Sequence, residues 1–235
     1  MNPLPFYFQR KENAWVCPTT HDFYKVSYAI DTKLSAKIEN NFGIQNVVVK
    51  DENHQILLKT EQIQDFEKVG IVMEKNLIRV DYAKIAQNSA TVLAPITKNL
   101  LNQVRNTKDL RHCVAAVAGL AQSLNYDVPD NYDKNTYKLG FRTPLEVLVK
   151  GSGDCDSRVC LAASMLKSVN LAQMVQVNIK GHSLLGVKLP IQSGDFSLVF
   201  ELEQYVLIEC TNLLPIGSCN LNSISNVKSY SVFKL

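Results

Sequence analysis

The sequence predicts an α+β protein, because its hydrophobic pattern changes character twice along the chain. Residues 1 to about 90 carry short β-branched and aromatic runs separated by polar turns, and helical periodicity begins at about residue 94. Alternating, strand-like runs return after residue 181. We therefore expect a β-rich N-terminal region over residues 1–90, whose role the sequence does not indicate, and a second domain over residues 91–235.

The composition is that of a globular protein with a sizeable core. Of the 235 residues, 46% are hydrophobic, and 25 Lys and Arg against 22 Asp and Glu leave a net charge of only +3. A charge this small and scattered predicts neither a nucleic-acid partner nor a membrane-binding face. No apolar run approaches the roughly 20 residues that span a bilayer, so we expect no membrane insertion. The first residues lack the features of a signal peptide, which leaves a cytoplasmic or a processed periplasmic or secreted location open.

The pattern along the chain gives the individual elements. Strands are expected at residues 24–30, 46–49, 56–59 and 77–82, and helices at residues 94–104 and 113–124. The polar connection over residues 126–142 is longer than the roughly 12–15 residues beyond which a loop is usually functional, so we expect it to border a site. Thr143 and Glu146 form a capping-box pattern and Pro144 takes the first helical position, which predicts a short helix over residues 144–149.

A cysteine marks the start of the next expected helix. Apolar or small residues recur with helical spacing over residues 155–168, and Cys155 begins that stripe. Asp154 is placed to cap the helix, and Gly151 and Gly153 permit positive φ and the close approach of a substrate. Unsatisfied N–H groups and the helix dipole at this end favour a thiolate, as a nucleophilic cysteine requires. The alternative is that Cys155 is a small buried hydrophobe.

A base and a carboxylate follow in the order that nucleophilic catalysis needs. Of the four histidines, His182 alone opens an alternating strand, and it does so directly after Gly181. Glu209 ends the apolar run 204–208 and is a candidate to orient the imidazole. Adjacent antiparallel strands would bring His182 and Glu209 within reach of each other. Taken singly, each of these residues has an ordinary structural explanation.

Together these residues resemble the transglutaminase-like superfamily, including the bacterial transglutaminase-like cysteine proteinases. The resemblance rests on residues 153–158, the strand beginning Gly181-His182, and residues 205–211, and it spans roughly residues 94–217. It also takes in Gln122, Tyr126 and the helix start at residue 143. The resemblance implies a papain-like α+β core, in which a Cys-bearing helix packs against an antiparallel sheet that bears the His and the carboxylate.

The resemblance also implies roles for individual residues. Cys155 is expected to be the nucleophile, His182 the general base and acid, and Glu209 the orienting carboxylate. The sequence departs from the family pattern in three ways: Glu209 replaces the commoner Asp, residues 190–203 lengthen the gap before it, and Ser157 stands where a second acid is often found. Calcium binding by Asp154 and Asp156 is not favoured, because helix capping explains Asp154 more simply.

The remaining expected site groups surround the nucleophile. The backbone N–H of Cys155 is the natural first donor to an oxyanion, and the side chain of either Gln122 or Tyr126 is the candidate second donor. The alternative for Gln122 is a solvated surface amide. Gly153, Asp154 and Gly181 are expected to line the substrate site.

We therefore expect a thiol-dependent acyl-transfer enzyme, specifically a cysteine peptidase or amidase that forms a thioester with a protein or peptide substrate and uses no cofactor or metal. A cross-linking transglutaminase and a non-catalytic binding module with the same fold remain alternatives. The other five cysteines fit a hydrophobic core. For Cys210 and Cys219, a disulfide in an oxidising compartment is the alternative.

Overall fold

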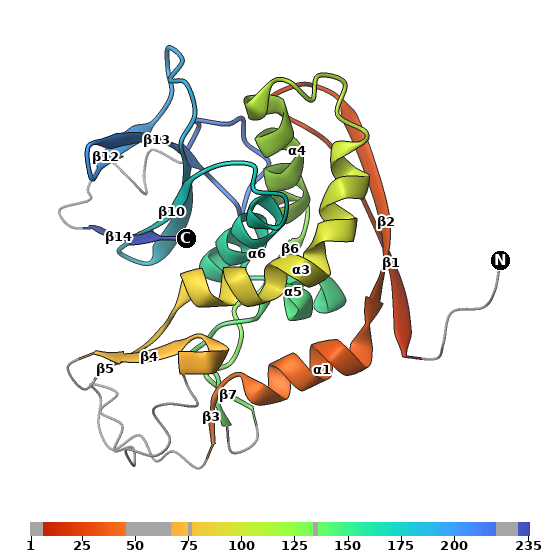
Figure 1. Ribbon diagram of the computed structural model, residues 1–235, viewed down its shortest axis with the longest axis vertical. Helices are drawn as coiled ribbons and strands as arrows, with labels where there is room; N and C mark the ends of the chain where they lie inside the picture. Colours follow the sequence, from red (N-terminus) through yellow and green to blue (C-terminus); the bar gives the residue numbers. More distant parts are fainter. Residues whose placement is uncertain (1–6, 46–66, 75–76, 134–135, 220–229) are drawn as a thin grey trace.

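The computed structural model describes residues 7–45, 67–74, 77–133, 136–219 and 230–235. Three helices lie between a five-stranded sheet on one side and a long β-hairpin on the other (Figure 1). The helices of this layer are α3 (Tyr82–Leu101), α4 (Leu110–Gln122) and α6 (Cys155–Ser168). The fold is thus a mixed α/β arrangement in which helices are covered from two sides by strands.

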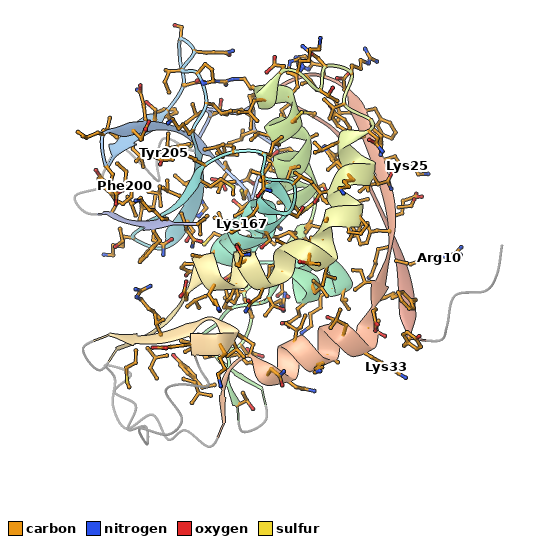
Figure 2. The ribbon with its side chains drawn as sticks, viewed as in Figure 1. Arg10, Lys25, Lys33, Lys167, Phe200 and Tyr205 are labelled. Atoms are coloured by element: carbon orange, nitrogen blue, oxygen red, sulfur yellow. The ribbon has the colours of Figure 1, made fainter. Side chains whose placement is uncertain are left out.

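The N-terminal hairpin packs directly onto the helices. It consists of β1 (Phe8–Val16) and β2 (Phe23–Asp31), which pair antiparallel over their whole length. Alternate residues of β2 are buried, and they share one hydrophobic core with residues of α4 and α6. Arg10, Lys25 and Lys33 lie on the hairpin and on the following helix α1 (Thr32–Asn41), on the side away from the sheet (Figure 2).

The five-stranded sheet forms an antiparallel half-barrel with the strand order β12-β13-β11-β10-β14. Its strands are β10 (Met174–Ile179), β11 (His182–Val187), β12 (Ser197–Phe200), β13 (Glu203–Ile208) and β14 (Tyr230–Lys234). One face, with Leu185 and Ile208, belongs to the core that includes α6. The other face carries a separate apolar cluster that contains Tyr205 and is flanked by Phe200 (Figure 2).

Short elements connect these layers. They include the helix α5 (Pro144–Lys150) and the short strands β3 (Ile44–Gln45), β4 (Ile71–Glu74), β5 (Leu77–Val80), β6 (Asn125–Tyr126), β7 (Tyr132–Asp133), β8 (Thr136–Tyr137) and β9 (Ser152–Gly153). The parallel pair β6 and β9 matters most for the site, because β9 ends immediately before Asp154 and Cys155. No helix within the described part of the chain has the length and apolar character needed to cross a membrane.

Several expected elements are confirmed and others need correction. The helix over residues 155–168 is confirmed with the predicted bounds, and α5 begins at Pro144 as predicted. The capping box was wrong, since the Thr143 hydroxyl caps no backbone N–H and is buried without a partner. The strands expected at residues 46–49 and 56–59 lie outside the described residues.

The first long helix also begins earlier than expected. α3 starts at Tyr82 rather than at residue 94, because Asp81 caps it and Pro95 lies inside the helix. The predicted division of the chain at residue 90 therefore falls within a continuous helix. The hairpin, which precedes residue 90 in the chain, shares one hydrophobic core with α4 and α6, which follow it.

Candidate active site

Cys155 is held at the first turn of α6 by local backbone hydrogen bonds. The Asp154 carboxylate accepts from the N–H of Ser157 at 3.3 Å and caps the helix, as predicted. Cys155 is partly exposed, whereas the other five cysteines are buried free thiols. The expected core role of those five is therefore confirmed, and Cys155 is the one thiol within reach of a substrate.

His182 reaches the site from the start of β11, directly after a tight turn. Gly181 adopts a φ of +76°, and a side chain added there would meet no other atom, so the turn conformation accounts for this glycine. His182 pairs with Ile179 across the β10–β11 hairpin. Its side chain is 17% exposed, and its Nε2 lies 2.8 Å from Oε2 of Glu209.

Glu209 follows β13, the neighbour of β11 in the sheet. The strands are antiparallel with Leu185 opposite Ile208, which brings Glu209 to the end of the sheet where β11 begins. Adjacent antiparallel strands therefore join His182 and Glu209, as the sequence predicted. The carboxylate is almost fully buried, and its second oxygen accepts from the backbone N–H of Thr211 at 2.8 Å and from the Thr211 hydroxyl at 2.6 Å.

The electrostatics of the three groups favour a charged imidazole. A hydrogen bond with Cys155 and then one with Glu209 raise the pKa of His182 to about 10, against a smaller opposing effect of burial. Burial raises the pKa of Glu209, but hydrogen bonds from His182 and Thr211 outweigh it and leave that pKa below its ordinary value. Because Nε2 is engaged by Glu209, Nδ1 is the ring nitrogen that remains for the thiol. The raised pKa favours the imidazolium at neutral pH, and the ring then donates from Nε2 to Glu209.

Gln122 is buried, so the alternative of a solvated surface amide is wrong. Its Nε2 donates to the carbonyls of Glu209 at 2.8 Å and Leu214 at 3.0 Å. An amide nitrogen carries two hydrogens, and both are engaged here. In this arrangement Gln122 has no donor free for an oxyanion. Tyr126, the alternative donor, is 56% exposed. Partial burial, and then the nearby Cys155, raise the pKa of the Tyr126 phenol.

The residues expected to line the substrate site lie next to Cys155 or His182. Gly153 is buried with its carbonyl used by internal hydrogen bonds, and a side chain at this position would lie 3.2 Å from Val147. Close packing thus accounts for Gly153. The sequence prediction that Gly153, Asp154 and Gly181 contact substrate stays a prediction.

Two groups near the nucleophile were missed by sequence reasoning. Arg158 is fully buried one turn after Cys155, and their spacing of three residues on one helix face is a signal that was available in the sequence. Asp156 accepts from the Tyr82 hydroxyl at 3.0 Å, and burial together with the nearby Asp154 carboxylate raises the pKa of Asp156 to about 8. The contact with Tyr82 spans 74 residues of sequence, so local patterns gave no sign of it.

A large cavity lies elsewhere in the molecule. It has a volume of about 800 Å³ and is lined by residues that include Lys167 and Tyr205, both labelled in Figure 2. Lys167 is at the far end of α6 from Cys155, and twelve helical residues place the two ends about 18 Å apart. The cavity is therefore separate from the candidate active site. In the part of the chain that the structure describes, no group of three or more His, Cys, Asp or Glu side chains is arranged to hold a metal ion.

No protein-family model, curated protein or solved structure matches the chain. What the site does is therefore inferred from its geometry and its chemistry.

Proposed function

We propose that the protein is a thiol-dependent acyl-transfer enzyme, and specifically a cysteine peptidase or amidase with a papain-like, transglutaminase-like core. One observation carries the proposal: the His182 ring is hydrogen-bonded to Glu209 at 2.8 Å, and interaction with Cys155, at the N-terminus of α6, is the largest cause that raises the pKa of His182. A nucleophile, a base and an orienting group in contact with one another are the signature of an activated nucleophile.

The proposed reaction begins with a Cys155 thiolate and a His182 imidazolium. The sulfur attacks the carbonyl carbon of an amide, and the backbone N–H of Cys155 donates to the oxyanion that forms. His182 gives its proton to the leaving nitrogen, the C–N bond breaks, and an amine leaves a thioester on Cys155. A water molecule then loses a proton to His182 and attacks the thioester, which releases a carboxylic acid and restores the thiolate.

The charge state of His182 supports this order of events. A ring that is already protonated at neutral pH can act first as an acid toward the leaving amine. Glu209 has no free oxygen, since one faces His182 and the other faces Thr211, so its role in the proposal is to orient and stabilise the imidazolium.

Alkylation of the thiol tests the proposal. The protein and its Cys155→Ala and His182→Ala variants are incubated with iodoacetamide between pH 5 and 9.5, and the modified residue is located by mass spectrometry. We expect Cys155 to react at pH 6 at least about tenfold faster than an ordinary thiol, and His182→Ala to abolish that advantage. The five buried cysteines serve as internal controls. A Cys155 that reacts at pH 6 like an ordinary thiol would contradict the proposal.

A second assay separates hydrolysis from cross-linking. Casein is incubated with the protein in the presence of a fluorescent primary amine, and both new peptide termini and amine incorporation are measured. We expect new termini that depend on Cys155, without incorporation. Incorporation of the amine would instead identify a transglutaminase, because the amine then replaces water in the second step.

A further inference from the structure

Two buried side chains hold the backbone that leaves β13, and neither belongs to the triad. Gln122, the last residue of α4, donates to the carbonyl of Glu209. Arg158, in α6, donates through one terminal nitrogen to the carbonyls of Cys210 at 3.4 Å and Thr211 at 3.1 Å. Three consecutive carbonyls are therefore held by donors from two helices. We call Gln122 and Arg158, with the carbonyls of residues 209–211 that they bind, the carbonyl clamp.

Arg158 also binds the backbone on the other side of the site. Its Nε donates to the carbonyl of Gly153 at 2.9 Å, and its second terminal nitrogen donates to the carbonyl of Leu124 at 2.6 Å. Gly153 lies two residues before the nucleophile, and Leu124 comes directly before β6, which pairs with β9. The Arg158 guanidinium thus connects β9, which comes just before Cys155, with the segment that carries Glu209.

The guanidinium is buried without a matching carboxylate. Arg158 has no measurable exposure, and over the described ranges of the chain no carboxylate lies within ion-pair distance of it. Its partners are the four carbonyls and the ring of Tyr126, whose centroid is 5.8 Å away. The Glu209 and Asp154 carboxylates act on its charge from beyond ion-pair distance.

Burying a charge in this way is costly for stability, and the cost is offset by hydrogen bonds to four backbone carbonyls that an apolar side chain would leave unpaired. Arg158 therefore calls for an explanation beyond packing. Its five donors point in fixed directions in one plane, and four carbonyls from three separate segments meet them.

We infer that the carbonyl clamp sets the position of Glu209 against His182 and fixes the position of Glu209 relative to the start of α6, where Cys155 lies. This inference rests on the proposed function. In it, Gln122 and Arg158 are positioning residues that do not touch the substrate. Gln122 is thereby assigned a role different from the oxyanion donor that the sequence suggested, since both of its amide hydrogens already bind carbonyls.

Alkylation distinguishes the two roles, because iodoacetamide reacts by displacement and forms no oxyanion. The variants are Gln122→Met and Arg158→Lys, where lysine keeps the charge and loses the planar fork. Leu161→Ala is the matched control, since Leu161 is fully buried in the same helix as Cys155 and Arg158 but belongs neither to the triad nor to the carbonyl clamp. For each variant we measure the melting temperature, the rate of Cys155 alkylation from pH 5 to 9.5 well below that temperature, and the cleavage of casein.

We expect Leu161→Ala to lower the melting temperature and keep the wild-type pH profile of alkylation. In Arg158→Lys the rate of Cys155 alkylation at pH 6 should fall at least about tenfold relative to wild type, while the rate above pH 9 stays within about threefold of wild type. The reason is that a mispositioned Glu209 no longer stabilises the imidazolium, so the thiol of Cys155 ionises only at high pH. Gln122→Met should change in the same direction. If Arg158→Lys does not fold, Gln122→Met decides the question alone.

Two results would overturn the inference. If both variants lose stability and keep the wild-type pH profile, the clamp is a packing device only. If Gln122→Met keeps the alkylation profile and loses casein cleavage, Gln122 is an oxyanion donor after all. A wild-type Cys155 that is unreactive at pH 6 is a different outcome, which contradicts the proposed function itself.

Discussion

Replacing Glu209 by Gln removes the negative charge that lies 2.8 Å from Nε2 of His182, and we expect the pKa of His182 to fall. The wild-type pKa of about 10, compared with an ordinary value of 6.5, corresponds to a preference for the imidazolium of about 5 kcal/mol. Hydrogen bonding to Cys155 is the larger cause and Glu209 the next. Assigning about 2 kcal/mol to Glu209 predicts that Glu209→Gln weakens proton binding by His182 about 30-fold.

The ordering of the two causes gives a second, independent expectation. Cys155→Ala should also lower the pKa of His182, because interaction with Cys155 is the largest cause that raises it. The assay is a pH titration of the histidine Cε1–H signals by NMR, which is practical because the chain has four histidines. His182→Gln identifies the signal. If His182 titrates near its ordinary pKa in the wild-type protein, or if neither substitution moves it, the arrangement of charges inferred for the site is refuted.

Other substitutions test parts of the structure around the site. Asp156→Asn should raise the melting temperature relative to wild type by an amount that grows between pH 4 and pH 8. The pKa of Asp156 is about 8 in the folded protein, so between these pH values the carboxyl ionises in the unfolded chain and stays protonated in the folded one. The free energy of unfolding of the wild-type protein therefore falls as pH rises. Asp154→Ala should cost less than the usual loss of about 1 kcal/mol for a helix cap, measured by urea unfolding, because Asp156 also accepts from the same backbone N–H at 2.8 Å. Arg111→Met should lower the free energy of unfolding by about 1.5–3 kcal/mol, because the Asp195 carboxylate loses its charged partner at 2.5 Å and keeps the N–H of Gln192; an unchanged free energy of unfolding would contradict this.

The proposed triad residues were chosen from the sequence largely by their local surroundings. Cys155 follows a capping Asp and precedes a helical stripe, and His182 follows a glycine that makes a hairpin turn. The pairing of His182 with Glu209 required β11 and β13 to be adjacent and antiparallel, and they are, although β12 lies between them in the chain. Local patterns therefore carried enough information for these three residues.

The early start of α3 could not be predicted in the same way. The predicted start rested on helical periodicity, which becomes clear only from about residue 94. In the structure Pro95 lies in the helix interior, and the preceding turns bury small residues such as Ala86 and Ala90 that give a weak periodic signal.

The role of the clamp residues also lay beyond sequence reasoning. Gln122 and Arg158 bind carbonyls 87 and 52–53 residues away, and backbone carbonyls leave no trace in the sequence. A polar residue that binds only main-chain atoms looks the same in a sequence as a solvated one. Tertiary structure alone distinguishes the two.

The contact between Trp15 and Gly119 has a practical consequence for handling the protein. Trp15 of β1 lies against α4 where Gly119 leaves no room for a side chain: an added Cβ would be 2.2 Å from the indole nitrogen. Trp15 is buried and is the single tryptophan of the chain. Tryptophan fluorescence therefore reports on the packing of the hairpin against α4 at Gly119, which is three residues before Gln122. A fragment that starts at residue 91 would lack this cover and expose the apolar side of α4, so the intact chain is the proper material for measuring activity.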